Sequence, residues 1–397
     1  MTGAREQDTD ILSGSIVAGP STTALLDALG AGQASARTGL LSSRKTEAPR
    51  EGLTFFQLAV DSDSNQIVEE IRRIAGTRSV DRLIIECESD RPPMAYASLF
   101  SVPEHLPQSL NDVAKLTGTA YAIQPAALLG AILGRRTSSL PASFVAEQVE
   151  FVSDLFLEGL PGDKDFDLAR AVALTLNPRA QIMPLIPPDV QRWHERRGSS
   201  FNFEAALNGA GWRQLLDHEQ PILTPDKKIT AFGYQSHRPF HPERFWNLLQ
   251  KDLRNVFRAK GFFWLATRMD EVGGLNLAGT DLHCASAGAW WAARDQTSRE
   301  SEMPERTRAE WKEPFGDRRQ AFALMALDLD RATLQSQLDA CLLTDAELAG
   351  GSESWTGFAD PFPSWSSDAH AHHHHHRDHH HECDHDHGSE EHDCCHH

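Results

Sequence analysis

The chain has 397 residues, with 38 Lys and Arg against 56 Asp and Glu, which gives a formal net charge of -18. This balance argues against general binding to nucleic acid or to an anionic membrane, because both need a basic surface. No apolar run approaches the ~18 residues that would span a bilayer. The first residues, MTGAREQDTDIL, lack the apolar core of a signal peptide. We therefore expect a cytoplasmic protein, long enough for two domains with tails.

The N-terminal stretch DILSGSIVAGPSTTALLDALG predicts a strand, a glycine turn and an amphipathic helix. This is the frame of a phosphate-binding loop, and the pattern G-x-x-x-x-G-K-[ST] falls on Gly14, Gly19, Pro20 and Ser21. Pro20 stands in the place of the lysine, so both an ammonium group and a backbone N–H are missing. Ser21, followed by Thr22, could still hold Mg²⁺.

The middle of the chain predicts a continuing series of strands and helices up to about residue 190. Residues 32–52 are polar and are expected to form a loop. Residues 191–228 are expected to be a linker carrying one short helix around FNFEAALNGAGWRQLL.

The C-terminal half predicts a compact sheet domain. ITAFGY is typical of a strand, and His241-Pro242-Glu243 can start an amphipathic helix, since apolar residues recur at Phe245, Leu249, Leu253 and Val256. GFFWLAT is expected to be a strand preceded by a Lys260-Gly261 turn. Further strands are expected at GLNLAG, GAWWAA and RQAFALMALDLD, and a last helix at ATLQSQLDACLL. Strands in sequence with flanking helices favour an α+β domain.

Several side chains in this half have two interpretations. His237 and His241 could ligate a metal ion, or they could cap and pack the strand-to-helix turn, which we favour. Arg318 and Arg319 beside Asp317 could receive an anion, but we favour an ion pair at a strand start. A group of aromatic residues is expected in the core or at a domain interface rather than around a cofactor: Trp290, Trp291, Trp311, Phe315 and Trp365.

The last 28 residues, HAHHHHHRDHHHECDHDHGSEEHDCCHH, hold 14 of the 20 histidines, three of the six cysteines and seven carboxylates. Such a segment cannot bury apolar surface, so we expect it to be disordered without metal. Imidazole and thiolate suit zinc, Cu(I), nickel and cobalt. The tail could fill several four-ligand shells in interchangeable ways, which favours exchangeable binding of several ions. A purification tag and a functionless polar tail are the alternatives.

The predicted metal ligands are the histidines and cysteines of this tail. They are His370, His372, His373, His374, His375, His376, His379, His380, His381, Cys383, His385, His387, His392, Cys394, Cys395, His396 and His397. The other cysteines, Cys87, Cys284 and Cys341, lie far apart and do not suggest a disulfide framework.

A set of ordered blocks between residues 228 and 365 carries a family resemblance. RPFHPERF, FRAKGFFWLA, AWWAA, FGDRRQAFALMALDLD, LDACLLTDAEL and W-x-x-x-x-DPFPSW together resemble the C-terminal domain of the CobW family, which are P-loop GTPase metallochaperones. The blocks resemble those of the zinc-chaperone-like subgroup most. The resemblance implies a nucleotide-binding domain before residue 190 and zinc as the metal.

The resemblance also shows what the N-terminal half has lost. The family's Cys-x-Cys-Cys metal motif is absent from FFQLAVDSDSNQIVEEI. The family's E-x-x-G-x-x-x-P segment matches at Glu86 and Pro93, but Ser89 replaces the glycine. Glu86 and Glu88 are alternatively polar residues at a strand end. Where N-K-x-D should read guanine, the chain has Asp163-Lys164-Asp165. The nucleotide-site residues carried over by the pattern are therefore Gly14, Gly19, Ser21, Thr22 and Glu86, as a vestigial set.

The sequence thus predicts an α/β P-loop-type domain with a mostly parallel sheet over residues 8–190, a linker over 191–228, an α+β CobW-like domain over 229–365 and a metal-binding tail over 366–397. We expect a zinc-trafficking protein without catalytic residues, for which GTP and Mg²⁺ are doubtful cofactors. The alternatives are a working GTPase metallochaperone and a non-catalytic partner of an intact paralogue that serves as a metal reservoir. The expected partners are metal ions, with an intact paralogue or a zinc-dependent client as further candidates, and neither nucleic acid nor membrane.

Overall fold

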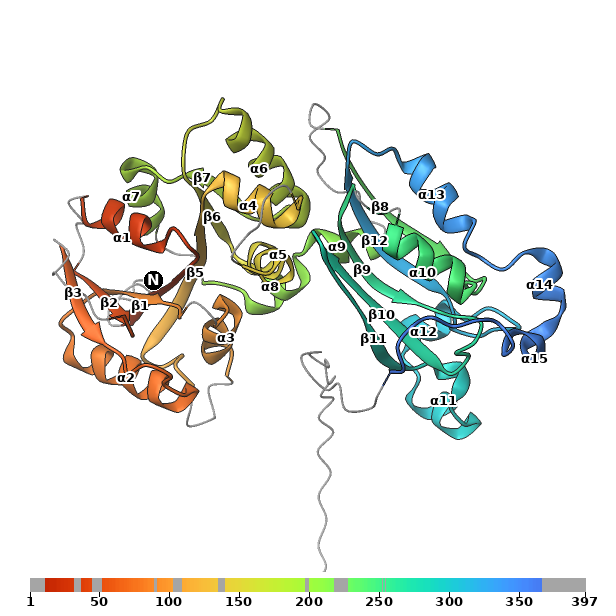
Figure 1. The fold of residues 1–397 in the computed structure, drawn as a ribbon. Coiled ribbons are helices and arrows are strands. Elements are labelled where there is room, and N and C mark those ends of the chain that lie inside the picture. The colour runs from red at the N-terminus through yellow and green to blue at the C-terminus, as the bar shows by residue number, and fades with distance from the viewer. Residues whose placement is uncertain are drawn as a thin grey trace, which may run out of the picture.

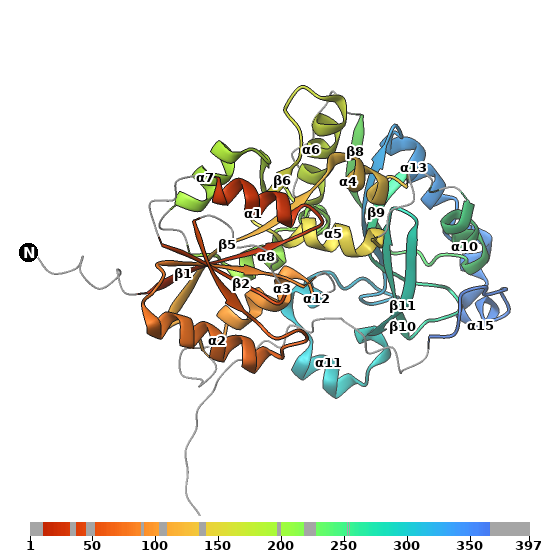
Figure 2. The ribbon, with the colours of Figure 1, turned by 60° about the vertical axis from the view of Figure 1, so that its left-hand side comes forward.

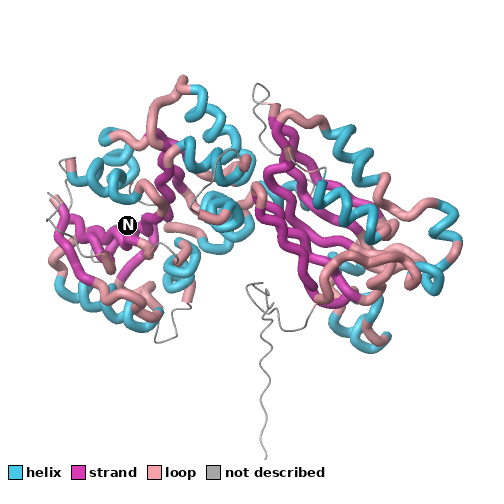
Figure 3. The backbone as a smooth tube through the Cα atoms, viewed as in Figure 1, coloured by secondary structure: helices cyan, strands magenta, loops and turns pink. Residues whose placement is uncertain are grey.

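The computed structural model describes residues 11–31, 37–44, 52–88, 91–102, 109–134, 140–196, 200–217, 228–251, 253 and 255–365. The chain forms two sheets that lie side by side, one parallel and one antiparallel (Figure 1). Figure 3 shows the strands of each sheet as a continuous layer with helices around it. The expected fold class is therefore confirmed. Among the described helices, none is both long and apolar enough to cross a bilayer.

The first sheet has seven parallel strands in the order β3-β2-β4-β1-β5-β6-β7. Its central strands are nearly wholly buried, as expected where both faces of a parallel sheet are covered. The strands are β1 (Leu12–Ala18), β2 (Thr38–Ser42), β3 (Leu53–Gln57), β4 (Arg82–Glu86), β5 (Ala114–Ile123), β6 (Asp154–Leu157) and β7 (Gln181–Pro184).

Helices cover both faces of this sheet (Figure 2). On one face α1 (Thr22–Gly30) and α7 (Pro187–Glu195) pack on alternate strand residues such as Val17 and Ile84. The other face is covered by α2 (Ser64–Thr77), α3 (Pro93–Ala97), α4 (Pro125–Ile132), α5 (Ala142–Phe151) and α6 (Lys164–Leu176). Asp63 is the N-cap residue of α2. Its side chain accepts a hydrogen bond from the N–H of Gln66 and forms a capping box with it.

The second sheet has five antiparallel strands in the order β11-β10-β9-β12-β8. Its strands are β8 (Ile229–Ser236), β9 (Val256–Phe263), β10 (Glu271–Ala278), β11 (Asp281–Ala289) and β12 (Gln320–Leu327). One face packs on α10 (Pro242–Lys251) and α13 (Arg331–Asp339) through a stack of phenylalanine rings. Phe240 and Phe245 lie with their ring centroids 4.2 Å apart.

The remaining helices are short, and all but the first lie around the second sheet, whereas the first packs on α5 beside the parallel sheet. They are α8 (Phe203–Asn208), α9 (Gly211–Leu216), α11 (Gln296–Glu302), α12 (Glu305–Ala309), α14 (Asp345–Ala349) and α15 (Gly351–Trp355), with short 3₁₀ turns at Ser98–Phe100 and Trp291–Ala293. Of these, α9 packs on β8, β9 and β12, between the two sheets.

A buried ion pair joins the two sheets. Arg258 of β9 is 1% exposed and Glu150 of α5 is 6% exposed, with Arg258 Nε 2.6 Å from Glu150 Oε1. The guanidinium also donates to Asn276 and to the Leu277 carbonyl, and Trp212 Nε1 donates to the same carboxylate at 3.2 Å. Because these partners satisfy both charges, the pair is tolerated at full burial.

Some expected elements differ from the structure. The predicted Lys260-Gly261 turn is wrong, because both residues lie inside β9. Gly261 is needed there, since its φ is +149° and an added Cβ would lie 2.2 Å from the Ala321 carbonyl oxygen. Val256 begins β9 instead of ending α10, and the Trp291 region is a 3₁₀ turn after β11.

The loop and the linker also contain more structure than expected. The range 32–52 was expected to be a loop, yet it contains the buried strand β2, which is only five residues long. The range 191–228 holds the end of α7 and two short helices, α8 and α9, where one was expected. Short elements of this kind give too little hydrophobic periodicity to be recognised from sequence.

Candidate functional site at the carboxyl edge of the parallel sheet

The parallel sheet changes winding direction at β1, whose neighbours are β4 and β5. Ligands of such sheets bind beyond the carboxyl ends of the strands at this point. The five residues predicted for a vestigial nucleotide site come from β1, the following turn, α1 and β4. Gly19, Ser21, Thr22 and Glu86 do lie at this edge, but Gly14 does not.

Gly14 lies inside β1, where it is paired with Leu83 of β4 and Leu116 of β5. A phosphate-binding loop would leave the sheet after such a glycine and wrap an anion with the next residues. Here β1 continues as a strand through Ala18. The expectation that Gly14 and Gly19 bound a phosphate loop is therefore wrong, because the residues between them form sheet hydrogen bonds.

The turn after β1 is short and its backbone donors are occupied. Ser21 N donates to the Ala122 carbonyl at 3.0 Å, and Thr22 N donates to the Gly19 carbonyl at 3.2 Å. The Thr22 hydroxyl also donates to Gly19, at 2.6 Å. Gly19 has a φ of +108°, and an added Cβ would lie 2.3 Å from the Ala122 oxygen. The turn is thus pressed against β5, and two of its N–H groups are already used within the protein.

Ser21 is bound to a carboxylate. Its hydroxyl, 5% exposed, donates to Glu158 Oε1 at 2.5 Å, and Gln124 Nε2 donates to the other oxygen at 3.1 Å. Ser21 is the N-cap of α1, the positive end of the helix. A phosphate-loop protein places a phosphate there, but this chain places its own carboxylate, which would repel a phosphate.

Glu86 is held by neighbours of its own. It is 4% exposed, accepts a hydrogen bond from the Ser42 hydroxyl at 2.5 Å and pairs with Arg44 Nη1 at 3.1 Å. These bonds match the interpretation of Glu86 as a polar residue at a strand end. Ser89, predicted to replace the family glycine, lies outside the described residues, and Pro93 begins α3.

The segment predicted to replace the guanine-reading motif begins α6. Asp163 is its N-cap residue and Lys164 its first helical residue. An open pocket of about 610 Å³ lies there, lined by Glu158, Asp163, Asp165 and Lys164 among others. Three carboxylates against one ammonium make this pocket a poor place for a phosphorylated ligand.

No group of three or more His, Cys, Asp or Glu side chains suited to a metal ion occurs within the described ranges. All the predicted tail ligands, from His370 to His397, lie outside those ranges. Cys87 and Cys341 are buried and Cys284 is partly buried, and none of the three forms a disulfide within the described residues. Burial raises the pKa of Cys87 well above its usual value, and the nearby Glu86 carboxylate raises it further. This thiol therefore stays protonated.

For the residues of the C-terminal half that had two interpretations, the contacts favour a structural role over the binding of a metal ion or an anion. His241 lies against the ring of Phe358, at 4.6 Å between centroids, and burial lowers its pKa and that of His237. Arg318 pairs with Asp270 and Arg319 with Glu310, as ion pairs near the start of β12.

The aromatic residues are mostly packed as expected. Trp290 is 3% exposed in a cluster with Trp264 and Phe315, and the Arg268 guanidinium lies 4.2 Å from the Trp365 ring.

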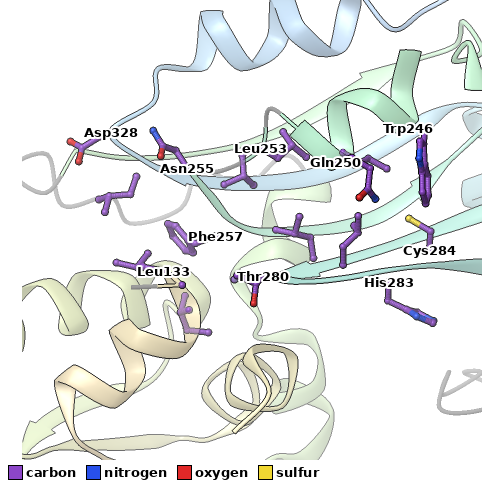
Figure 4. Close-up of a pocket in the computed structure, with 18 of the residues that line it drawn as sticks. Leu133, Trp246, Gln250, Leu253, Asn255, Phe257, Thr280, His283, Cys284 and Asp328 are labelled. Atoms are coloured by element: carbon purple, nitrogen blue, oxygen red, sulfur yellow. The ribbon is translucent and has the colours of Figure 1, made fainter. Parts of the chain in front are cut away.

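A larger groove lies where the two sheets meet, with a volume of about 920 Å³ (Figure 4). Its walls come from the end of α4, from α10 and from β9 to β11, and carry both apolar and polar side chains. Cys284, His283 and Trp246 lie along it (Figure 4). Cys284 and His283 are neighbours on β11 and so point to opposite faces of the sheet, which makes them unsuitable as a ligand pair.

Comparison with known proteins supports the resemblance seen in the sequence. Residues 229–342 match the cobalamin synthesis protein cobW C-terminal domain. The chain is CobW-like, and its second sheet domain is a CobW C-terminal domain. The recognition made from the sequence blocks is therefore confirmed.

Two relatives illustrate the likeness. Zinc-regulated GTPase metalloprotein activator 1 of Dictyostelium discoideum is 26% identical over 315 residues, which cover 74% of this chain and 66% of that protein. Zinc chaperone Rv0106 of Mycobacterium tuberculosis is 35% identical over 151 residues, 37% of this chain and 38% of that protein. The chain thus spans under two thirds of the length of each. The crystal structure of Zn(II)-bound YjiA GTPase from E. coli matches 84% of this chain at 12% identity, with a TM-score of 0.35 that is too low to show a shared fold.

Sequence reasoning missed Glu158, Arg44 and Tyr121 at this edge. Glu158 follows β6 and Arg44 closely follows β2, so both sit where parallel strands end. A charged residue directly after a buried strand was the available signal for them. Tyr121 had no such signal, because inside the apolar run of β5 it resembles any core aromatic residue.

Proposed function

We propose that this chain is a CobW-like zinc-handling protein whose tail binds the metal and whose sheet edge does not turn over GTP. The observation that carries the second part is the hydrogen bond from Ser21 to Glu158 at 2.5 Å, beside a β1 that continues through the expected loop. Phosphoryl transfer depends on positioning and on neutralising phosphate charge. Here a carboxylate takes the place of the phosphate, and the loop lysine is missing.

The metal side of the proposal is supported by the tail and by the relatives. The tail brings 14 histidines and three cysteines within 28 residues, and two relatives are named for zinc. Zinc takes four such nitrogen or sulfur ligands. Because the ligands are mixed and close together, the tail is suited to holding several ions that exchange readily, as in delivery or buffering.

Zinc titration tests the metal proposal. Zinc should bind the full chain with a stoichiometry of several ions, releasing protons because His and Cys ligate in their deprotonated forms. A chain ending at Ser367, which keeps all described residues, should lose most of these sites. A full-length variant with the tail histidines and cysteines changed to serine is the matched control for tail length. Equal stoichiometry in the wild type and the truncated chain would refute the proposal.

The truncation makes a second prediction. The strands and helices of the C-terminal domain are complete before residue 366, so the metal-free thermal midpoint of the chain ending at Ser367 should stay close to that of the full chain. Differential scanning calorimetry in the presence of a chelator measures this. A large drop would mean that the tail packs on the fold and contributes more than ligands.

A further inference from the structure

The strand β11 forms one border of the antiparallel sheet. It pairs with β10 on its inner side, and no strand within the described residues pairs with its outer side (Figure 1). None of its nine residues is fully buried. An unpaired edge presents a row of backbone N–H and C=O groups that can bind a further strand. The outer side of β11 is therefore a candidate interaction surface.

The sequence of this edge has little of the usual protection against pairing. Charged residues and prolines commonly keep edge strands apart. Residues 282–293 contain no Asp, Glu, Lys, Arg or Pro, although 24% of the whole chain is charged. The carboxylate of Asp281 is engaged with the first domain, because Oδ2 accepts hydrogen bonds from the N–H and the hydroxyl of Ser143 at 3.0 and 3.2 Å. A bulge interrupts the strand only beyond Ser286.

The β10–β11 hairpin determines which backbone groups point outward. Its turn is two residues long, at 279–280, so Asp281 begins the strand in a hydrogen-bonded pair with β10. Such pairs alternate along an antiparallel ladder, so every second residue is bonded to β10. The residues between them direct their N–H and C=O groups away from the sheet. They are Leu282, Cys284 and Ser286.

The side chains of β11 differ between its two faces. Cys284 lies on the face of α10, on the same side as Trp246, whereas His283 points to the opposite face (Figure 4). Leu282 shares the face of Cys284, because side chains alternate along a strand. A strand added to β11 with a similar sequence would extend this apolar face beside α10.

We propose that the outer edge of β11 pairs with β11 of a second copy of this chain, antiparallel and around a two-fold axis at Cys284. In this register Leu282 lies opposite the partner's Ser286, and His283 lies opposite the partner's Ala285. The strand is thus complementary to itself, because these pairs oppose no like charges. A two-fold contact of this kind is closed and leaves no outer edge on β11.

The net charge of the chain favours this surface for contact between copies. Each copy carries a formal net charge of -18, so two copies repel one another over most approaches. An interface between them needs a surface without charge, and the run from 282 to 293 provides one. No metal ion takes part in this contact. The proposal therefore goes beyond the proposed function and is independent of it.

Sedimentation velocity of the full chain in the presence of a chelator tests the proposal. The chelator prevents metal ions from joining the tails of two copies. We expect a monomer–dimer equilibrium in a concentration series up to about 100 µM, where micromolar dissociation constants are resolved. A wild-type chain that stays monomeric throughout the series would overturn the proposal.

A pair of double variants tests the register. His283→Lys with Ala285→Lys places like charges directly opposite each other at two symmetric positions, and should weaken association by roughly 10-fold. His283→Glu with Ala285→Lys places opposite charges at the same positions, and should restore association to within about threefold of the wild type. Circular dichroism checks that both variants are folded. Loss of the dimer in both variants would contradict the antiparallel register around Cys284.

A matched control adds the same charge elsewhere in the domain. Ala332→Lys with Gln335→Lys introduces two lysines at exposed positions of α13, which packs beside β8 at the opposite border of the sheet. This variant, and a chain ending at Ser367, should associate as the wild type does. Equal association in all variants would place the contact elsewhere and overturn the proposal. A dimer that is lost only in the truncated chain would assign the contact to the tail and also overturn it.

Discussion

The carboxyl edge of the parallel sheet and the core of the antiparallel domain differ in the interactions that hold them together. The antiparallel domain matches a family model over 229–342 and is held by stacked aromatic rings such as Phe245 and Phe322. In the parallel sheet, β1 continues through Ala18, and the carboxyl edge holds Ser21 bound to the Glu158 carboxylate. The edge of the first sheet therefore pairs its polar side chains with one another, whereas the second domain is held by apolar packing.

The largest effect is expected where the two regions meet. Arg258→Ala leaves Glu150 as a buried charge without its partner, which typically costs about 3–5 kcal/mol. Chemical denaturation should show this loss of the free energy of unfolding. Arg306→Ala, which breaks an exposed pair with Asp217, should cost at most about 1 kcal/mol. Equal losses in the two variants would show that the joint between the sheets is not buried as described.

A histidine on the parallel-sheet side gives a pH-dependent effect. Burial, followed by the nearby Arg82 charge, lowers the pKa of His194 to about 4, and its Nε2 is 2.9 Å from Thr38 Oγ1. The unfolded chain binds the proton near pH 6.5, so the contribution of this group is present above pH 6.5 and is lost as pH falls toward 4. The loss by pH 4 should reach roughly 3 kcal/mol, at 1.36 kcal/mol per pKa unit.

His194→Gln isolates this term, because the rest of the chain titrates equally in both proteins. The difference in free energy of unfolding between wild type and variant should shrink between pH 6.5 and 4. A difference that stays constant over this range would contradict the buried, neutral imidazole, and would place this side of the sheet in contact with water.

A smaller effect on the free energy of unfolding is expected at the carboxyl edge of the parallel sheet. Ser21→Ala removes the donor that Glu158 accepts and should cost about 1–3 kcal/mol. Ser301→Ala, whose exposed hydroxyl bonds only within α11, should change stability by no more than about 0.5 kcal/mol. If Ser21→Ala is as neutral as this control, the hydroxyl is not engaged with Glu158, and the contrast between the two regions weakens.

The C-terminal domain could be predicted largely from sequence because its pattern and its structure agree. The strand at ITAFGY, the helix after His241 and the last helix at ATLQSQLDACLL are all present. The errors came from local ambiguity. Gly261 was predicted to lie in a turn, but it lies in a strand where neighbouring backbone leaves no room for a Cβ. Only the packing of β9 against β12 shows this.

The candidate site was less predictable for a related reason. The spacing of Gly14 and Gly19 fits a phosphate loop, but spacing does not show whether the intervening residues leave the sheet. The partner of Ser21 is Glu158, 137 residues away in the chain, and no local pattern links them. Pro20 at the lysine position of the pattern was visible in the sequence, whereas the hydrogen bond between Ser21 and Glu158 could be seen only in the fold.

The most direct test of the central claim is GTP hydrolysis by the wild-type chain, measured with and without Mg²⁺ beside Ser21→Ala. The account predicts no Mg²⁺-dependent turnover above the rate of this variant, and no GTP binding at micromolar concentration in calorimetry. Pro20→Lys should not restore hydrolysis, because β1 still occupies the place of the loop. Wild-type turnover that depends on Mg²⁺ and falls in Ser21→Ala would contradict the account and establish a working GTPase.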